Sequence, residues 1–462
     1  MYATSRSVRT LLTALLVALL ALAVSAAFGA GEARAGSGST PGSILWKHTP
    51  NPTPHGDGLW LCAPAPGGGG YVCGTTGWIQ EDLTSMDIWV VRYRANGTMA
   101  WSRTWDGPDR RSDDAGGMVV DRAGNVYVAG STVRAAGSRD SVVLKYTPSG
   151  ALKWATVYAA SAQEDEARSI GLDAAGKVYV GGELLTGSNW NAYVARFDGA
   201  TGVRDWTAVY DSGGYDVGWR LAVTKAGDSY LVGQTATALT GYDALLVKVT
   251  AAGGVDWARS YAGTNADSDA WETVDLARGG GVLVAGEPDG TGEVSIVGVA
   301  RYTSVGDRKW LGSWTMPPTI FMTVTAAAPT GSGGIWVAGY MRSAAGNYRG
   351  FVGKWNSAGS GGSGRVAGSA KHQVRYEGLV LDRAGNVYVT GTAKASASGW
   401  NLLAAKYSPG CMPRWRTTAS FGGKHDDELD QAVLGPSGTI YSCGLVREDT
   451  ANSRAVVVRI RR

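Results

Sequence analysis

The sequence predicts an all-β protein, a closed ring of eight four-stranded antiparallel sheets, on three observations. A short apolar segment that ends in Gly recurs eight times, at intervals of 51 to 56 residues. Each interval holds four strand-like segments separated by turn signals, and no helical period of apolar residues is sustained after residue 35. The first and last units complement each other. These features are typical of an eight-bladed β-propeller in which each sheet is one blade.

The recurring segment is the expected second strand of each unit. In the unit at 113–158, residues 116–120 and 126–130 flank a turn at 121–125, and residues 140–146 and 152–158 flank a turn at 148–150. This order predicts a four-stranded meander. The glycines that end the eight second strands are Gly74, Gly130, Gly182, Gly233, Gly286, Gly339, Gly391 and Gly444.

The two ends of the array predict how the ring closes. Residues 43–48 match a fourth strand, whereas the last unit stops after its third strand at 456–459. We therefore expect the N-terminal strand to complete the last blade, which places Trp46 near Val457 and hides two sheet edges.

Two units resemble a known repeat. Residues 121–132 read DRAGNVYVAGST and residues 382–392 read DRAGNVYVTGT, and both resemble the SBBP-type bacterial β-propeller repeat. The resemblance extends loosely over 43–462 and is weakest at the Gly/Ser-rich segment 356–370, which lacks the fourth-strand Trp. It implies an exported bacterial propeller and carries over no catalytic residue.

A second segment is similar to a different propeller family. Residues 198–206, DGATGVRDW, are similar to the Trp-docking motif of quinoprotein propellers, which also have eight blades. The chain lacks the adjacent-cysteine pair that is common in those dehydrogenases. We interpret this likeness as shared propeller packing.

Composition and the N-terminal segment bound the class of protein. Gly accounts for 68 of 462 residues without a triplet period, and 44% of residues are hydrophobic, which excludes collagen and disorder. Arg6 and Arg9, an apolar run at 11–28 and the small-x-small motif at 33–35 predict a signal peptide over 1–35 and a secreted, extracellular propeller domain over 36–462. An uncleaved anchor is the alternative. The net charge of +4 gives no reason to bind nucleic acid.

The four cysteines suggest disulfides in an exported chain. Cys62 and Cys73 lie in neighbouring expected strands, so we pair them, which leaves Cys411 with Cys443. The competing pair is Cys73 with Cys443, at equivalent repeat positions. Their spacing and the presence of only four His argue against a zinc site.

Two residue types recur in the outer strands. We expect the fourth-strand tryptophans to pack between blades, and the third-strand basic residues to form structural ion pairs, with an anion-binding ring as the alternative. The tryptophans are Trp46, Trp101, Trp154, Trp206, Trp257, Trp310 and Trp415, and the basic residues are Arg92, Lys145, Arg196, Lys248, Arg301, Lys354, Lys406 and Arg459.

An aspartate precedes the marker glycine by 17 residues in six units. We expect these carboxylates at the inter-blade turns near the mouth of the central channel, where they accept backbone hydrogen bonds. The alternative is an oxygen-rich ring for Ca²⁺, and no other cofactor or metal is expected. The six are Asp57, Asp113, Asp165, Asp216, Asp269 and Asp427.

The loops between the second and third strands vary most, and they open on the same face as the inter-blade turns. Variable loops on a rigid frame are where binding usually resides, so we expect aromatic side chains there to stack on a sugar or a protein. The candidates are Trp78, Trp190, Tyr242, Tyr348 and Trp400.

No cluster of reactive residues breaks the repeat. The sequence has no nucleophile elbow or phosphate loop, and its isolated carboxylates, such as Glu164 and Glu166, are not specific. We expect a monomeric, non-catalytic scaffold that binds a protein or polysaccharide through one face. The alternative is an extracellular enzyme, either a quinone-dependent dehydrogenase or a glycan-cleaving propeller.

Overall fold

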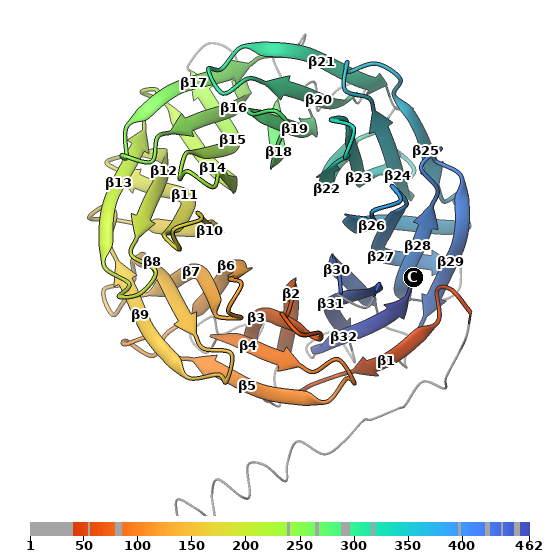
Figure 1. Cartoon of the computed structure of the whole chain (residues 1–462), viewed down its shortest axis with the longest axis horizontal. Helices are drawn as coiled ribbons and strands as arrows, with labels where there is room; N and C mark the ends of the chain where they lie inside the picture. Colours follow the sequence, from red (N-terminus) through yellow and green to blue (C-terminus); the bar gives the residue numbers. More distant parts are fainter. Residues whose placement is uncertain are drawn as a thin grey trace, which may run out of the picture.

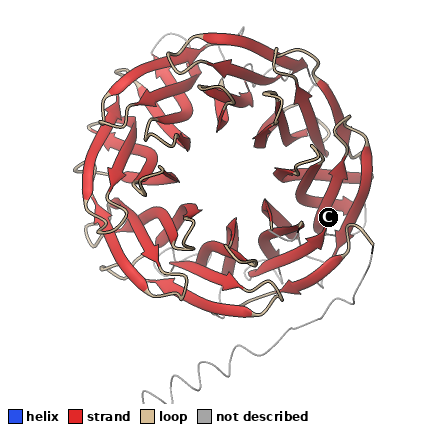
Figure 2. Ribbon diagram, in the orientation of Figure 1, coloured by secondary structure: helices blue, strands red, loops and turns tan. Residues whose placement is uncertain are grey.

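The protein is a closed ring of eight sheets around a central channel (Figure 1). The computed structural model describes residues 40–53, 56–78, 86–237, 241–263, 268–287, 296–315, 319–395, 399–420, 426–435, 438–447 and 453–462. These residues form 32 strands in eight four-stranded sheets. Figure 2 shows strands and loops, without a helix, throughout the described chain. The predicted signal peptide lies outside the described residues.

The first four blades each take four consecutive strands, innermost first. Blade 1 contains β2 (Gly56–Pro64), β3 (Gly70–Trp78), β4 (Asp87–Tyr93) and β5 (Met99–Trp105). Blade 2 contains β6 (Asp113–Val120), β7 (Val126–Val133), β8 (Arg139–Tyr146) and β9 (Leu152–Tyr158). Blade 3 contains β10 (Asp165–Leu172), β11 (Val178–Thr186), β12 (Asn189–Phe197) and β13 (Arg204–Tyr210). Blade 4 contains β14 (Tyr215–Val223), β15 (Ser229–Thr237), β16 (Gly241–Val249) and β17 (Val255–Tyr261).

The remaining blades follow the same order, except that the first strand of the chain completes the last blade. Blade 5 contains β18 (Ala270–Leu276), β19 (Val282–Glu287), β20 (Ile296–Tyr302) and β21 (Arg308–Thr315). Blade 6 contains β22 (Phe321–Pro329), β23 (Ile335–Arg342), β24 (Tyr348–Trp355) and β25 (Ser363–Ala367). Blade 7 contains β26 (His372–Leu381), β27 (Val387–Ala395), β28 (Trp400–Tyr407) and β29 (Pro413–Ala419). Blade 8 contains β30 (Asp427–Leu434), β31 (Thr439–Arg447), β32 (Ser453–Arg461) and β1 (Ile44–His48).

The ring closes as the sequence predicts. β1 pairs antiparallel with β32, so that Trp46 faces Arg459 and His48 faces Val457. The N-terminal strand thus covers the edge of β32 and holds the two ends of the array together. Among the described residues, no helix is long and apolar enough to cross a membrane.

The meander gives each blade two distinct ends. The first and third strands begin at one end, where the second and fourth strands finish, and we call this end of the ring the loop face. The opposite end carries the tight turns that join the third strand to the fourth, and we call it the turn face. The variable loops and the inter-blade connections therefore share the loop face, as expected.

Neighbouring blades are joined through the tight turns of the turn face. The carbonyl oxygen of Pro148 in blade 2 accepts hydrogen bonds from Trp101 Nε1 of blade 1, at 2.9 Å, and from Arg92 Nη1. Ser304 repeats this pattern, accepting from Trp257 Nε1 at 3.1 Å and from Lys248 Nζ at 3.0 Å. The tryptophans therefore serve packing, as predicted.

The basic residues of the third strands differ in part from expectation. Lys248 forms an ion pair with Asp256 and Arg196 forms one with Asp205, both at 2.9 Å, but most of the set donate to a backbone carbonyl of the next blade. A carbonyl offers these cations an acceptor without the cost of burying a second charge. The basic residues that make this contact are Arg92, Lys145, Arg196, Lys248, Lys354 and Arg459.

Candidate binding site on the loop face

The six predicted aspartates all lie near the start of an innermost strand, and all are buried. Asp165 accepts hydrogen bonds from the backbone N–H groups of Ala160 and Ser161 at 2.7 and 3.0 Å. Asp216 accepts from the N–H of Ser212 at 2.7 Å and from Thr235 Oγ1 at 2.5 Å. Asp57, Asp113 and Asp269 accept from Gly77, Gly107 and Gly263 in the same way. Their main role is to fix the inter-blade turns.

These aspartates are distributed over six blades and do not meet around one point. Within the described chain, Asp113 is the one member of the set that joins a group of carboxylates close enough to share an ion. The alternative of an oxygen-rich Ca²⁺ ring would need these carboxylates to gather around one ion.

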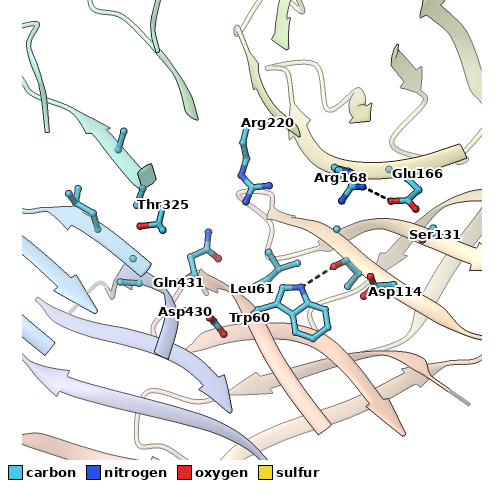
Figure 3. A pocket seen from close by; sticks show the side chains of 18 residues that line it. Trp60, Leu61, Asp114, Ser131, Glu166, Arg168, Arg220, Thr325, Asp430 and Gln431 are labelled. Carbon is cyan, nitrogen blue, oxygen red and sulfur yellow. Dashed lines mark hydrogen bonds and ion pairs between the residues drawn. The ribbon is translucent and has the colours of Figure 1, made fainter. Parts of the chain in front are cut away.

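A cavity of about 500 Å³ occupies the central channel. Figure 3 shows Arg220 extending from β14 into the opening, with Gln431 and Asp430 on one side and Arg168 and Glu166 on the other. Trp60 closes part of the wall, since its Nε1 donates to the carbonyl oxygen of Ala115 at 3.0 Å. The lining is more polar than that of a typical small-molecule site.

An ion-pair network runs through the wall formed by blades 2 and 3. Arg168 lies 2.8 Å from Glu166 and 2.6 Å from Glu183, and Arg139 lies 3.0 Å from the other oxygen of Glu166. Three carboxylates, Asp114 included, share these two arginines. Burial raises the pKa of Asp114 and of Glu183, while Arg168 acts to lower that of Glu183.

A second network lies across the channel in blades 7 and 8. Arg375 pairs with Glu428 at 2.5 Å and with Glu377 at 3.6 Å. Burial raises the pKa of Glu377 to about 8 and that of Asp430 to about 7. In β18 of blade 5, burial likewise raises the pKa of Asp275 to about 7. The negative charge of the channel therefore decreases as the pH falls through this range.

Arg375 also forms the centre of an aromatic group on the loop face. Its guanidinium lies 5.4 Å from the ring centroid of Tyr340, 5.5 Å from that of Tyr348 and 5.0 Å from that of Trp400. Tyr348 and Trp400 are in edge-to-face contact at 5.7 Å, and Phe321 lies 5.9 Å from Tyr340. Cation–π contacts with Tyr340, Tyr348 and Trp400 hold the guanidinium of Arg375 in place.

The predicted aromatic candidates thus have different surroundings. Trp400 is buried and Tyr348 is half-buried in this group, whereas Tyr242 is 41% exposed and stacks edge-on against Tyr215 at 5.4 Å. Trp190 is half-buried, and the side chain of Trp78 lies outside the described residues.

Sequence reasoning missed Tyr215, Phe321, Tyr340 and Arg375. Tyr215 directly precedes the predicted Asp216, and Phe321 begins an innermost strand. A search of the residues around each predicted turn aspartate would have found Tyr215. Arg375 carries no signal of its own, because its role depends on rings from three other strands.

The expected cysteine pairs are not formed in this structure. All four cysteines are buried free thiols in this structure. Cys73 faces Leu61 across the ladder and Cys62 faces Val72, so the two sulfurs lie on opposite sides of blade 1. Cys411 lies in the core between blades 6 and 7, away from Cys443.

The thiols that do share one core are Cys62 and Cys443, from the first and last blades. Burial raises the pKa of the Cys443 thiol, and a hydrogen bond with Cys62 adds to this effect. This pairing could not be read from repeat positions, because it depends on how blade 8 stacks on blade 1.

Comparisons with known proteins support the propeller fold and do not assign the chain to a family. No protein-family model matches the chain, and no curated protein matches it. Among solved structures, the Dos1 propeller is similar with a TM-score of 0.56 and 9% identity, over 91% of this chain and 95% of that one.

Two further structures represent binding propellers and quinoproteins. Chaetomium thermophilum Sqt1, bound to the N-terminus of ribosomal protein L10, has a TM-score of 0.54 and 12% identity, over 88% of this chain and 98% of that one. The quinohemoprotein alcohol dehydrogenase ADHIIG from Pseudomonas putida HK5 has a TM-score of 0.51 and 12% identity, over 88% of this chain and 76% of that one. At these identities the similarity shows that the chain shares the eight-bladed propeller fold.

Proposed function

We propose that the protein is a secreted, non-catalytic propeller scaffold that binds a protein or polysaccharide partner through its loop face. One observation carries this proposal. Among the described residues, the exposed large aromatic side chains are Tyr215, Tyr242 and Phe321, which are 37%, 41% and 46% exposed. All three lie at the start of a first or third strand, and hence on the loop face.

The surroundings of these rings suit recognition. Ile320, beside Phe321, is 59% exposed and extends the apolar surface. The central channel, with its polar lining, opens at the middle of the ring that blades 4 and 6 help to form (Figure 1). Aromatic rings supply large contact areas at low entropic cost in binding surfaces. The turn face carries exposed aliphatic side chains instead, such as Val203 and Val305, at 63% and 65%.

The solved structures that share this fold are consistent with the proposal. Sqt1 binds a protein segment, and the quinohemoprotein enzyme keeps open the alternative of quinone-dependent chemistry. The arginines and carboxylates in and around the channel are ion-paired with one another, which supports a polar binding surface over a redox centre.

The proposal predicts a face-specific loss of binding. The purified protein is screened against a glycan array and, separately, against secreted proteins of its source by cross-linking, and the best ligand is then titrated. We expect Tyr242→Ser and Phe321→Ser to weaken binding by about tenfold or more each, because each removes an exposed ring of the kind that dominates interfaces.

Val203→Ser and Val305→Ser are the matched controls and should bind as the unmodified protein does. Equal losses from both faces would contradict the proposal. So would reduction of a dye after addition of pyrroloquinoline quinone and Ca²⁺, which would establish the enzymatic alternative.

A further inference from the structure

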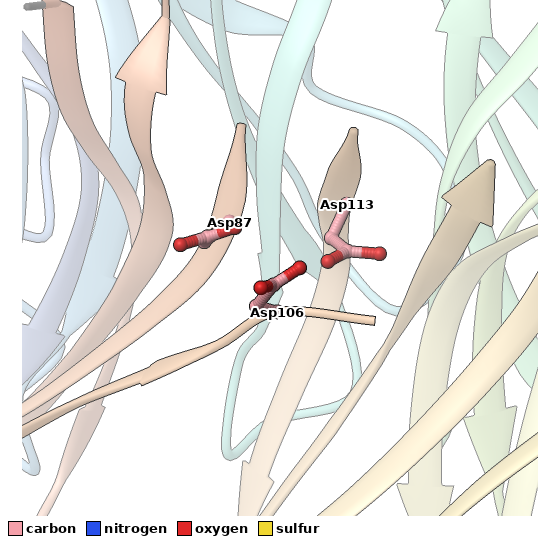
Figure 4. Close-up of side chains that lie close together, drawn as sticks. All are labelled: Asp87, Asp106 and Asp113. Atoms are coloured by element: carbon pink, nitrogen blue, oxygen red, sulfur yellow. The ribbon is translucent and has the colours of Figure 1, made fainter. Parts of the chain in front are cut away.

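Three carboxylates converge where blade 1 meets blade 2 on the loop face. Asp87 begins β4, Asp106 follows the end of β5, and Asp113 begins β6. One carboxylate oxygen from each lies within 4.8 Å of the other two (Figure 4). The described chain brings no other such group of His, Cys, Asp or Glu together.

The buried member of the group is incompletely satisfied. Asp113 has no exposed surface, and its Oδ2 accepts a hydrogen bond from the Gly107 N–H at 2.6 Å. Its Oδ1 and the Oγ1 of Thr132, which faces it across the β6–β7 pair, are both buried and have no well-formed hydrogen bond among the described residues, although the Thr132 hydroxyl acts to lower the pKa of Asp113. Figure 4 shows one oxygen of Asp113 turned toward Asp106. A buried oxygen without a donor costs about 1–3 kcal/mol, so Oδ1 calls for a positive partner.

The charge of the group is also poorly compensated. Three carboxylates gather within a few ångström of one another, and the side chain of one of them, Asp113, is fully buried. The nearby cation is Arg110, whose Nε lies 3.9 Å from Asp106 Oδ2, and this pair is largely exposed to solvent. An exposed pair of that kind contributes little.

The chain contains a version of the same arrangement with one carboxylate fewer. At the junction of blades 3 and 4, Asn191, Asp211 and Asp216 occupy the positions of Asp87, Asp106 and Asp113. The Asn191 amide, in the orientation that satisfies both of its ends, donates to Asp211 Oδ1 at 3.2 Å. Both oxygens of Asp216 accept hydrogen bonds, from Thr235 and Ser212. One amide in place of one carboxylate therefore closes this junction without a cation.

The donor set at the first junction selects the kind of ion. Every available atom is an oxygen, from three carboxylates and one hydroxyl, which is the chemistry of a hard cation. Two ligands of one Ca²⁺ lie at most about 4.6–5.2 Å apart, twice the usual Ca–O distance of about 2.3–2.6 Å, and the observed oxygens fit this limit. The exposed side at Asp106 leaves positions for water. Mg²⁺ demands a stricter octahedral geometry.

We propose that Asp87, Asp106 and Asp113, assisted by the Thr132 hydroxyl, bind one Ca²⁺ ion between blades 1 and 2. The ion joins the third and fourth strands of blade 1 to the first strand of blade 2. It stabilises the inter-blade turn at the loop face, and it does so whether or not that face binds a partner.

The test uses the purified full chain after treatment with EDTA, titrated with CaCl₂ by calorimetry and by thermal unfolding, with NaCl balancing the ionic strength. We expect one site with a Kd of about 0.1 mM, at the weak end of protein Ca²⁺ sites. At about 10 mM Ca²⁺ the melting temperature should rise by about 3 °C, by mass action on a chain of this size.

Asp87→Asn recreates the junction of blades 3 and 4, in which one amide stands in place of a carboxylate. This variant should lose the Ca²⁺-dependent rise in melting temperature, and in EDTA it should melt above the unmodified protein because like-charge repulsion is gone. Asp211→Asn, which removes a carboxylate from the junction of blades 3 and 4, is the control and should keep the full response to Ca²⁺.

Three results would overturn the proposal. The first is the absence of both heat and a melting shift at 10 mM Ca²⁺. The second is an equal shift from NaCl alone or from Mg²⁺. The third is a response of Asp87→Asn equal to that of the unmodified protein.

Discussion

Seven junctions between blades are built alike, and the junction between blades 6 and 7 is not. In the seven, the fourth-strand tryptophan of one blade lies against a glycine in a tight turn of the next. A Cβ on any of these glycines would lie within 2.6 to 2.9 Å of an indole atom, and each glycine has a positive φ. The pairs are Trp46–Gly97, Trp101–Gly150, Trp154–Gly202, Trp206–Gly253, Trp257–Gly306, Trp310–Gly359 and Trp415–Gly42.

The exceptional junction changes both partners. Ser363 stands opposite Lys354, where other blades carry the tryptophan, and Cys411 occupies the turn position with a φ of 61°. The Cys411 side chain is buried in the core between blades 6 and 7. Lys354 Nζ still donates to the Pro409 carbonyl oxygen at 2.9 Å, so the cation contact persists without the indole.

The difference teaches why the turn residue is glycine. A positive φ alone favours glycine by about 1–2 kcal/mol, yet Cys411 adopts it. The stronger requirement is the indole of the preceding blade, which leaves no room for a Cβ. Where the indole is missing, a side chain is tolerated and fills the space.

The largest effect should come from removing one indole. We expect Trp101→Ala to destabilise the protein by about 3 kcal/mol, because it empties a buried site and leaves the Pro148 carbonyl with one donor fewer. Ser363→Ala, at the same position of blade 6, should change stability by less than about 0.5 kcal/mol. Urea unfolding of the two variants measures the difference, and similar values would break the comparison.

A smaller loss should follow from adding a Cβ under an indole. We expect Gly150→Ala to cost about 2 kcal/mol, since its φ is 84° and the new Cβ would lie 2.8 Å from Trp101 Cδ2. Cys411→Ala is the control, because a Cβ is already present there, and it should lose only the contacts of one sulfur. A harmless Gly150→Ala would show that the indole can move aside.

The smallest expected effect comes from exchanging residues between the two kinds of junction. This exchange tests the comparison most directly. Ser363→Trp alone should destabilise the protein by about 1–2 kcal/mol, because Cys411 occupies the space that the indole needs. Adding Cys411→Gly should recover that loss, giving a coupling energy of about 1 kcal/mol or more in a double-mutant cycle. Additive effects would mean that the two positions do not contact each other.

Much of the fold follows from local pattern. The spacing of the marker glycines predicts eight blades, and the unmatched strands at the two ends predict the pairing of β1 with β32, which is confirmed. The turn aspartates are also predictable, because an Asp that accepts backbone hydrogen bonds at a turn acts within a few residues of itself.

The groups of side chains that different blades bring together could not be predicted from local sequence pattern. The carboxylates of Asp87, Asp106 and Asp113 come from three strands of two blades. The exposed rings of Tyr215 and Phe321 lie on blades 4 and 6, and each is a single departure from the repeat. The sequence of a single repeat unit does not show that these side chains come together.

The sequence by itself determined the repeat, the number of blades and the way the ring closes, because hydrophobic alternation and turn chemistry act over a few residues and recur with the period. Only the tertiary structure decided that Cys62 lies near Cys443 rather than Cys73, and that three carboxylates share one junction. These contacts depend on which face of a strand each side chain occupies and on how neighbouring blades stack, and a one-residue change of register reverses the first.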